Sequence, residues 1–462
     1  MFTEKYSNKY TIFYIYLKKQ WHFFQKCVIM IYDHTLSSGE RTIKMKNIKK
    51  LAAIFLSAAL IVCSGCNNEQ PTESTSETDV PAQTDESGNI VTDENGDPIP
   101  AEPEEEKIWK VGFLYNGKVE DGSTAKIFEN ARAQIQRTLA LDTCYMENVL
   151  VSDIPAAVYA LEEDGCNIIV SCSPRFATSI EKEAKSAPET YFINFGGTSP
   201  AHNLSAFGGE LYQTANVCGI VGAFNTKSNV LGIVADPGCY NVYGIIDSYV
   251  LGAKEIWGTQ TDVRLNWVWS DNTEKIEAAI DDLITQGSDV IMCYTENDYA
   301  PEYAASKGVK VIANSCDLPE LIPDNYLTGF FFNASTFIID TVRSIKAETF
   351  VSTVHSGGIS AGTARFLQIS ANCEDGTETI ATKLYDYIKS GQAHVFTGEI
   401  KNRDNKVMVK KGQQMQFSGI SEIDWLVQGI SSVGDFTTVT YEPKPCDLTI
   451  KESKWNESAD SQ

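Results

Sequence analysis

The sequence KVGFLYNGKVEDGS, residues 110–123, contains the first unit of the fold that we expect. Lys110 to Tyr115 is a short apolar run, typical of a buried strand, and a polar loop follows it. The loop leads into an amphipathic stretch at 123–141, which predicts a helix. A strand followed by a helix of this length indicates a βαβ unit, and therefore a parallel sheet with helices on its faces.

The same alternation continues along the chain in two series. The first series adds strands at 142–150, 167–172 and 191–195 and helices at 154–164, 174–187 and 210–224. The second begins after Asn225, with strands at 229–235, 263–269, 289–294, 309–313 and 327–332 and helices at 240–257, 273–286, 299–307, 334–350 and 378–390. We therefore predict an α/β protein with two Rossmann-like lobes, whose strands end at a shared cleft.

A signal sequence precedes these lobes. Lys46, Lys49 and Lys50 are followed by an apolar run at 51–62, which is shorter than the ~20 residues of a membrane-spanning helix. Ser64-Gly65-Cys66 resembles the end of a bacterial lipoprotein signal, so we expect residues 45–65 to be cleaved and Cys66 to be lipidated. Residues 1–44 are interpreted as a leader that is untranslated or has no structural role, with translation starting at Met45.

The net charge of the protein argues against nucleic-acid binding. The chain has a net charge of −23, and removal of residues 1–65, with ten Lys/Arg and three Asp/Glu, leaves −23 − 7 = −30. Residues 66–107 are acidic, proline-rich and poor in large apolar side chains, so we expect a disordered tether. Such a field repels phosphates, and no nucleic-acid partner is expected. A transcription regulator on the same fold would need a basic DNA-binding segment where the acidic tether stands.

The cysteines and histidines do not indicate a catalytic or metal centre. Nine cysteines follow Cys66 singly, without a CxxC pair, and we interpret them as buried free thiols, although an exported chain leaves disulfides possible. His202, His355 and His394 are scattered, without zinc-like spacing, and neither a P-loop nor a GxGxxG motif is present. No metal, cofactor or catalytic residue is therefore expected.

Several segments together resemble the basic-membrane-protein family of ABC-transporter substrate-binding lipoproteins. They are VGFLYNGKVEDGS at 111–123, LYQTANVCGIVGAF at 211–224, LITQGSDVIMCYTEND at 283–298, VFTGEIKNRDNKVMVKKG at 395–412 and EIDWLVQGI at 422–430. The resemblance implies the type I periplasmic-binding-protein fold with a hinge. We expect residues 109–224 with about 333–389 to form one lobe and 229–332 the other. The segment 395–462 is expected to associate with a lobe or with the hinge and to have a disordered end.

Candidate ligand-binding residues follow the expected strands. In the first lobe they are Tyr115, Asp121, Gly122, Ser123, Phe176 and Tyr212, in the second they are Trp269, Asp271, Thr295, Glu296 and Asp317, and at the expected crossover between the lobes they are Phe332 and Asn333. The resemblance places a Gly-Asp-Gly-type ligand loop near Asp121, aromatic residues at Phe176 and Tyr212, and an aromatic-Asn pair at the hinge. For each residue a structural role remains open, such as helix capping by Asp121 or core packing by Phe176.

The expected function is solute binding rather than catalysis. Characterised members of the family bind purine nucleosides or related compounds and deliver them to an ABC permease. We expect a lipid-anchored protein on the extracytoplasmic face of the cell membrane, with a small polar aromatic solute, a purine nucleoside or base, as its ligand. The alternatives are a protein that binds a sugar or another small polar solute and an enzyme that acts on nucleosides.

Overall fold

A computed structural model describes residues 90–92, 107–260, 262–434, 441, 446 and 448–453. The chain divides into two units, residues 1–104 and 105–462, and the fold described below belongs to the second unit. The expected leader, the signal, Cys66 and nearly all of the expected tether lie outside the described residues. No helix in the described part is long and apolar enough to cross a bilayer.

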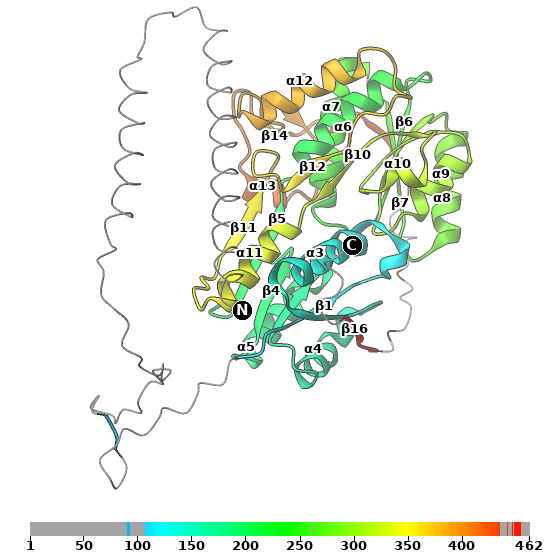
Figure 1. The fold of residues 1–462 in the computed structure, drawn as a ribbon. Helices are drawn as coiled ribbons and strands as arrows, with labels where there is room; N and C mark the ends of the chain where they lie inside the picture. Colours follow the sequence, from blue (N-terminus) through cyan, green and yellow to red (C-terminus); the bar gives the residue numbers. More distant parts are fainter. Residues whose placement is uncertain are drawn as a thin grey trace, which may run out of the picture. The chain divides into compact units, whose positions relative to one another are not determined.

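Two seven-stranded sheets organise this unit (Figure 1). The first has the order β11-β5-β4-β3-β1-β2-β16, and every pair is parallel except β16 with β2. Its strands are β1 (Lys110–Leu114), β2 (Asp142–Met146), β3 (Ile168–Ser171), β4 (Tyr191–Phe195), β5 (Leu204–Gly209), β11 (Val354–Gly357) and β16 (Lys451–Ser453). The helices α3 (Ser123–Leu139), α4 (Ile154–Glu163) and α5 (Ala177–Ser186) connect them.

The second sheet repeats this order as β12-β10-β9-β8-β6-β7-β15, with only the β12–β10 pair antiparallel. Its strands are β6 (Leu231–Ala235), β7 (Val263–Trp267), β8 (Val290–Tyr294), β9 (Lys310–Ala313), β10 (Tyr326–Phe332), β12 (Ala364–Phe366) and β15 (Ile430–Val433). The helices α7 (Val242–Trp257), α8 (Thr273–Thr285), α9 (Tyr299–Ser306) and α10 (Leu318–Leu321) connect these strands. Two parallel-dominated α/β lobes agree with the predicted fold class.

The sheets form because their central strands bury both faces. β3 and β8 are buried at every position, with the sequences Ile-Ile-Val-Ser and Val-Ile-Met-Cys-Tyr. Helices on each side supply the apolar partners, as expected for strands that read as continuous apolar runs. The core of the first lobe on the α4 and α5 side contains Leu114, Leu161 and Phe176.

The lobe boundaries differ from those expected. α6 (Tyr212–Asn225) packs on α7 and β10, so the expected first-lobe segment 109–224 ends in a helix of the second lobe. A Cβ on Gly219 would lie 2.0 Å from Tyr249 O, and one on Gly252 would lie 1.9 Å from Asn216 O. These glycines allow the close approach of α6 and α7, which fixes α6 in the second lobe.

The later crossovers also differ from the expected division. α11 (Ser335–Lys346) and β11 return to the first lobe, packing on α3 and pairing with β5. β12 then pairs with β10, and α12 (Thr377–Lys389) packs on α6, so most of 358–389 lies with the second lobe. Within the C-terminal segment, the hairpin β13 (Ile400–Lys401)–β14 (Val407–Val409) and α13 (Phe417–Ser421) precede β15, and β16 joins the first sheet. Edge strands are contributed by distant segments, which a local pattern does not reveal.

Candidate functional site

Four side chains meet where the central strands of the two sheets end. Asn116 follows β1 and Arg175 follows β3 in the first lobe, while Asp236 follows β6 and Glu296 follows β8 in the second. Because β1/β3 and β6/β8 occupy equivalent places in the two sheets, these are the topological switch points. Ligands of open parallel sheets bind at such points, outside the carboxyl ends of the strands.

Arg175 and Asp236 form an ion pair between the lobes. Arg175 Nη2 donates to Asp236 Oδ1 at 2.8 Å and to Oδ2 at 2.9 Å, and the Asp236 carboxylate is fully buried. Ser270 and Gly238 donate their backbone N–H groups to the same carboxylate. The guanidinium also lies 4.9 Å from the Trp269 ring centroid, a cation–π contact. Such a network holds a charged pair away from water between the two lobes.

The loop 121–123 makes a second contact between the lobes. Asp298 donates its backbone N–H to Asp121 O at 2.9 Å, and Ser123 N donates to Asp298 Oδ2 at 3.0 Å. Ser123 Oγ donates to Asn314 O at 2.7 Å. Gly122 has φ +79°, and a Cβ there would lie 1.9 Å from Asp298 Oδ2, so only glycine fits.

Glu296 is the central carboxyl group of the site. Asn116 Nδ2 donates to Glu296 Oε2 at 2.9 Å across the lobes, and Ser270 Oγ accepts from the Glu296 backbone N–H at 2.8 Å. Burial raises the pKa of Glu296 to about 7, against the opposing effect of the Arg175 cation. Burial likewise raises the pKa of Asp298 to about 6. Near neutral pH the Glu296 carboxyl can therefore accept or donate a hydrogen bond.

Two small cavities adjoin at Glu296. The inner cavity, of about 20 Å³, is lined by Thr124, Ile127, Phe128, Pro174, Phe195, Leu211, Cys239, Tyr240, Tyr294, Glu296, Asn314 and Phe332. The mouth cavity, of about 70 Å³, is lined by Asn116, Gly117, Lys118, Asp121, Asn148, Leu150, Arg175, Asp236, Ser270, Asp271, Glu296, Asn297 and Tyr441. The inner cavity is lined mainly by apolar residues, five of them aromatic, and the mouth cavity is lined mainly by polar residues.

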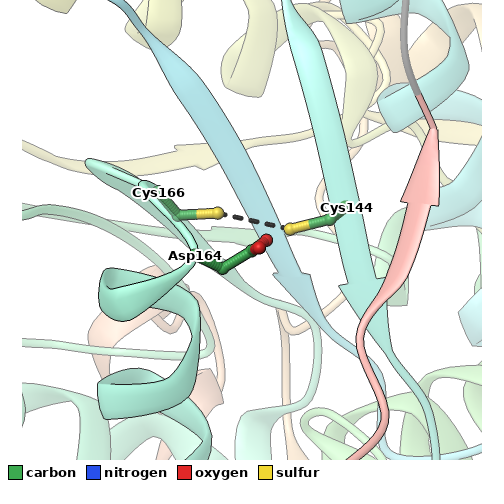
Figure 2. A group of neighbouring side chains, drawn as sticks. All are labelled: Cys144, Asp164 and Cys166. Carbon is green, nitrogen blue, oxygen red and sulfur yellow. Dashed lines mark hydrogen bonds between the residues drawn. The ribbon is translucent and has the colours of Figure 1, made fainter.

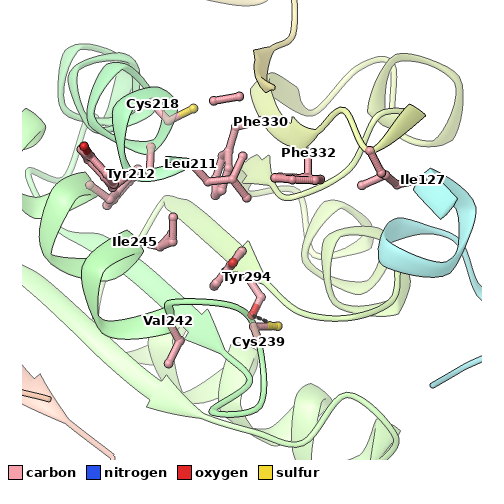
Figure 3. Close-up of a cluster of buried hydrophobic side chains, with 14 of the residues drawn as sticks. Ile127, Leu211, Tyr212, Cys218, Cys239, Val242, Ile245, Tyr294, Phe330 and Phe332 are labelled. Carbon is pink, nitrogen blue, oxygen red and sulfur yellow. Dashed lines mark hydrogen bonds between the residues drawn. The ribbon is translucent and has the colours of Figure 1, made fainter. Parts of the chain in front are cut away.

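Aromatic rings from both lobes surround the inner cavity. The Phe195 ring centroid lies 5.1 Å from those of Tyr240 and Phe332 and 5.2 Å from that of Phe128. Figure 3 shows Phe332 and Tyr294 near this region, with Cys239 Sγ in contact with Tyr294 O at 3.6 Å. Burial raises the pKa of Tyr240 to about 12, so its hydroxyl stays neutral. Asn314 Oδ1 is buried without a hydrogen-bond partner among the described residues.

Most of the predicted site residues lie at or near these contacts. Asp121, Asp271 and Glu296 line the mouth cavity, and Phe332 lines the inner one. Gly122, Ser123, Thr295 and Trp269 take part in or adjoin the interlobe contacts described above, with Thr295 O accepting from Ser123 Oγ at 3.2 Å. Asp317 lines a more open groove beside the mouth. Asn333 lies at the crossover, where its N–H donates to Thr363 O at 2.8 Å.

Three predicted residues lie elsewhere. Tyr115 is fully buried against Phe113 and Tyr145, and its hydroxyl donates to Glu129 Oε2 at 3.1 Å. Phe176 is fully buried in the first-lobe core under α5. Tyr212 faces Phe396 and donates to Glu210, at a separate groove lined by the segment 388–396. None of the three lines the inner or the mouth cavity, which contradicts the expected stacking of a ligand on Tyr115 or Phe176.

Sequence reasoning missed several residues of the site. Arg175, Asp236, Phe195, Tyr240 and Asn314 line the two cavities and were not among the candidates. Arg175 and Asp236 did carry a signal, because each is a charged residue that closely follows a buried strand at a switch point. Tyr441 comes from the C-terminal segment, and its ring lies 5.0 Å from that of Trp269. Nothing local in the sequence indicates that contact.

The fold and the site together define a class of protein. Two α/β lobes joined by crossovers, with polar and aromatic side chains from both lobes around a cleft, are the architecture of a type I solute-binding protein. A solved structure agrees: the ABC transporter system solute-binding protein of Conexibacter woesei covers 62% of this chain and 98% of its own, at TM-score 0.52 and 15% identity. That likeness shows the fold.

The family follows from the sequence comparison. The family model described as "ABC transporter substrate-binding protein PnrA-like" matches residues 108–385, more than half of the chain. The chain therefore belongs to this family and is an ABC-transporter substrate-binding protein, as the resemblance predicted.

Two curated relatives are similar over most of the chain. A purine-binding protein of Brucella abortus (strain 2308) is 27% identical over 331 residues, which cover 71% of this chain and 93% of the relative. A protein of Haloferax volcanii described as an ABC transporter glucose-binding protein is 21% identical over 314 residues, covering 67% of this chain and 78% of that protein.

Proposed function

We propose that this protein binds a purine nucleoside between its lobes and delivers it to an ABC permease. The observation that carries the proposal is the pairing of an aromatic inner cavity with a polar mouth cavity, joined at Glu296. A nucleoside has the same two parts, a flat aromatic base and a polyhydroxylated sugar. The purine-binding relative from Brucella supports this choice of ligand.

The inner cavity suits the base. Aromatic rings prefer offset or tilted partners at centroid separations of about 4.5–7 Å, so a purine can pack among Phe128, Phe195 and Phe332. Glu296 and Asn314 add hydrogen-bonding groups at the edge of this cavity. Because Asn314 Oδ1 has no partner within the described residues, an N–H group of the base would satisfy it.

The mouth cavity suits the sugar. It gathers the carboxylates of Asp121, Asp236 and Asp271 and the amides of Asn116 and Asn297. Carboxylate and amide oxygens accept hydrogen bonds from hydroxyl groups, and amide N–H groups donate to them. A free sugar fits this half of the site alone, which makes sugar binding the competing possibility.

Binding requires movement of the lobes. Cavities of about 20 and 70 Å³ do not hold a nucleoside, so the interlobe contacts through Arg175, Ser123 and Asn116 must open or rearrange. A ligand that contacts both lobes favours the closed arrangement by its difference in affinity for the two states. The permease can then distinguish loaded from empty protein. The proposed role is binding and release, without a chemical step.

Calorimetric titration of the full exported chain tests the ligand. Adenosine, guanosine and inosine should bind, and glucose, ribose and amino acids should not. At a hundredfold excess over Kd, a nucleoside should stabilise the folded state by about 2.7 kcal/mol. Glu296→Ala should abolish the titration heat, whereas Glu320→Gln, at an exposed carboxylate of α10, should not change it. Binding of a sugar without binding of any nucleoside would refute the purine assignment.

We propose further that lipid on Cys66 anchors the protein on the extracytoplasmic face of the membrane. The signal at 45–65 and the acidic segment 66–107 support this. Lipoproteins carry more than one acyl chain, which is enough for stable anchoring. Cys66→Ala should leave a soluble or unprocessed protein. Mature-size Cys66→Ala protein that still fractionates with membranes would contradict the proposal.

A further inference from the structure

Two buried cysteines of the first lobe face each other away from the ligand site. Cys144 lies on β2 and Cys166 lies two residues before the start of β3, and their Sγ atoms are 3.2 Å apart. Both side chains are buried, with 0% and 3% exposure. Figure 2 shows the two side chains pointing toward one another, with the Asp164 carboxylate beside them. The fold thus brings together two thiols that are separated by 22 positions in the sequence.

The strand between them leaves room for this contact. β1 lies between β2 and β3 in the sheet, and Gly112 of β1 is the register partner of Cys144. A Cβ on Gly112 would lie 3.2 Å from Cys166 Sγ and 2.9 Å from Leu161 Cδ1. Glycine therefore lets the Cys166 sulfur lie directly over the strand, where Cys144 can reach it. Any larger residue at position 112 would push the sulfur away.

The charges around the pair disfavour a metal ion. Cys144, Asp164 and Cys166 offer three ligand atoms within 4.8 Å of one another. The Asp164 carboxylate, however, accepts from Lys110 Nζ at 2.7 Å, and Lys110 Nζ also donates to Glu452 Oε1 at 2.8 Å. A divalent cation would stand beside this ammonium group and compete for the same carboxylate. An uncharged disulfide meets neither obstacle.

We propose that Cys144 and Cys166 form a disulfide bond in the exported protein. An S–S bond is about 2.05 Å long, so the two sulfur atoms must approach by about 1.1 Å from their present separation. Substrate-binding proteins of ABC transporters work outside the cytoplasm, where disulfides form and persist. The bond joins the start of β3 to β2 across β1, and so pins the crossover that contains α4.

The bond forms by thiol–disulfide exchange with an oxidised disulfide oxidoreductase. One cysteine thiolate attacks a sulfur of the oxidant disulfide, forming a mixed disulfide and releasing one oxidant thiolate. The second cysteine thiolate then attacks the protein sulfur of the mixed disulfide, forming the Cys144–Cys166 bond and releasing the other oxidant thiolate. The two cysteine protons end on the two thiols of the reduced oxidant, and two electrons pass to it. Contact with Cys144 and burial raise the pKa of Cys166, so this thiol is unreactive in the folded protein. The exchange therefore takes place during folding, before the pair is buried.

Peptide mapping of the exported full chain tests the proposal. The protein is denatured with an alkylating agent present and without reductant, and is then cleaved after glutamate. Glu147, Glu162 and Glu163 lie between the two cysteines, so cleavage separates them onto different peptides. We expect a linked pair of peptides that contain Cys144 and Cys166, which separates on reduction. Protein that is refolded with reductant should have a Tm about 5 °C below that of protein refolded with oxidised glutathione.

Single variants complete the test. Cys144→Ala should leave Cys166 alkylated, remove the linked peptides and abolish the dependence of Tm on reductant. Cys293→Ala, a buried thiol of the second lobe, should leave both results as in the unsubstituted protein. Alkylation of both Cys144 and Cys166 in the exported protein would overturn the proposal. Cys166 and Cys172 lie on the same peptide, 164–181, so fragmentation of the linked pair in the mass spectrometer locates the link, and a link through Cys172 with Cys166 alkylated would also overturn the proposal. One equivalent of zinc that protects both thiols until a chelator is added would also overturn it.

Discussion

Arg175 of the first lobe donates to both oxygens of the Asp236 carboxylate of the second lobe, at 2.8 and 2.9 Å. Arg175 follows β3 and Asp236 follows β6, strands that flank the switch points of their two sheets, and the carboxylate is fully buried. One guanidinium nitrogen, Nη2, contacts both oxygens of the buried carboxylate, and this charge-assisted contact fixes the distance between the two residues. It therefore links the relative position of the lobes to the polar half of the ligand site.

Removal of Arg175 should weaken both folding and binding. Arg175→Ala leaves Asp236 without its buried countercharge, so the free energy of unfolding should fall by about 3 kcal/mol. Arg175→Lys keeps the charge but not the planar guanidinium that lies over the Trp269 ring, and should recover only part of the loss. Chemical denaturation measures the stability and calorimetry measures nucleoside affinity. Arg343→Ala is the control, because the Arg343–Asp340 pair on α11 is exposed and should contribute less than about 0.5 kcal/mol. Equal losses in Arg175→Ala and Arg343→Ala would contradict this account.

Stability should depend on pH through Glu296. The pKa of its carboxyl rises from an ordinary 4.5 to about 7 in the folded protein, mainly through burial. The folded state therefore holds a proton that the unfolded state has released, and the free energy of unfolding should decrease as the pH rises from about 4.5 to about 7. Asp298, whose pKa rises to about 6, adds to the lower part of this range.

Denaturation curves of the ligand-free protein between pH 4 and 8 measure the effect. Glu296→Gln cannot titrate, so it should flatten the upper part of the profile, above about pH 6, where Asp298 no longer contributes. Glu320→Gln should leave the profile unchanged, because that carboxylate is exposed. A Glu296→Gln profile that matches the unsubstituted protein would show that folding does not raise the pKa of Glu296.

Gly122 should be intolerant of any side chain. Its φ of +79° is costly for other residues, and a Cβ would overlap Asp298 Oδ2 at 1.9 Å. Gly122→Ala should lower stability by about 1–3 kcal/mol and weaken nucleoside binding, because the loop 121–123 would lose its contact with the second lobe. Gly117→Ala is the matched control in the same loop, since a Cβ there has no neighbour within 4 Å. If Gly122→Ala is as stable as Gly117→Ala, the loop 121–123 does not contribute to the stability of the contact between the lobes.

The sequence predicted the fold class well and the site in part, for physical reasons. Buried parallel strands have a local signature, so the two βα series were recognisable. Asp121 and Glu296 follow such strands and were identified as candidates. The prediction that Tyr115 contacts the ligand is wrong. The sequence did indicate its position, because alternation along β1 puts Tyr115 on the same face as Val111 and Phe113, in the core. The crossovers of 358–389 and the contact of Tyr441 depend on long-range packing, which no local pattern encodes.

The aromatic inner cavity gives the sharpest test of the ligand. Phe332 lines this cavity, 5.1 Å from Phe195, whereas Phe176 is buried in the first-lobe core and lines neither cavity. Phe332→Leu and Phe176→Leu are the same substitution at two buried positions, and both should reduce stability. Only Phe332→Leu removes a ring that stacks on the base, a contact worth about 0.5–1.5 kcal/mol, so only this variant should weaken nucleoside binding, by up to about tenfold. Calorimetric titration of both proteins at a temperature well below their Tm measures the difference. If the two variants lose the same affinity, the effect comes from destabilisation and the base does not lie against Phe332.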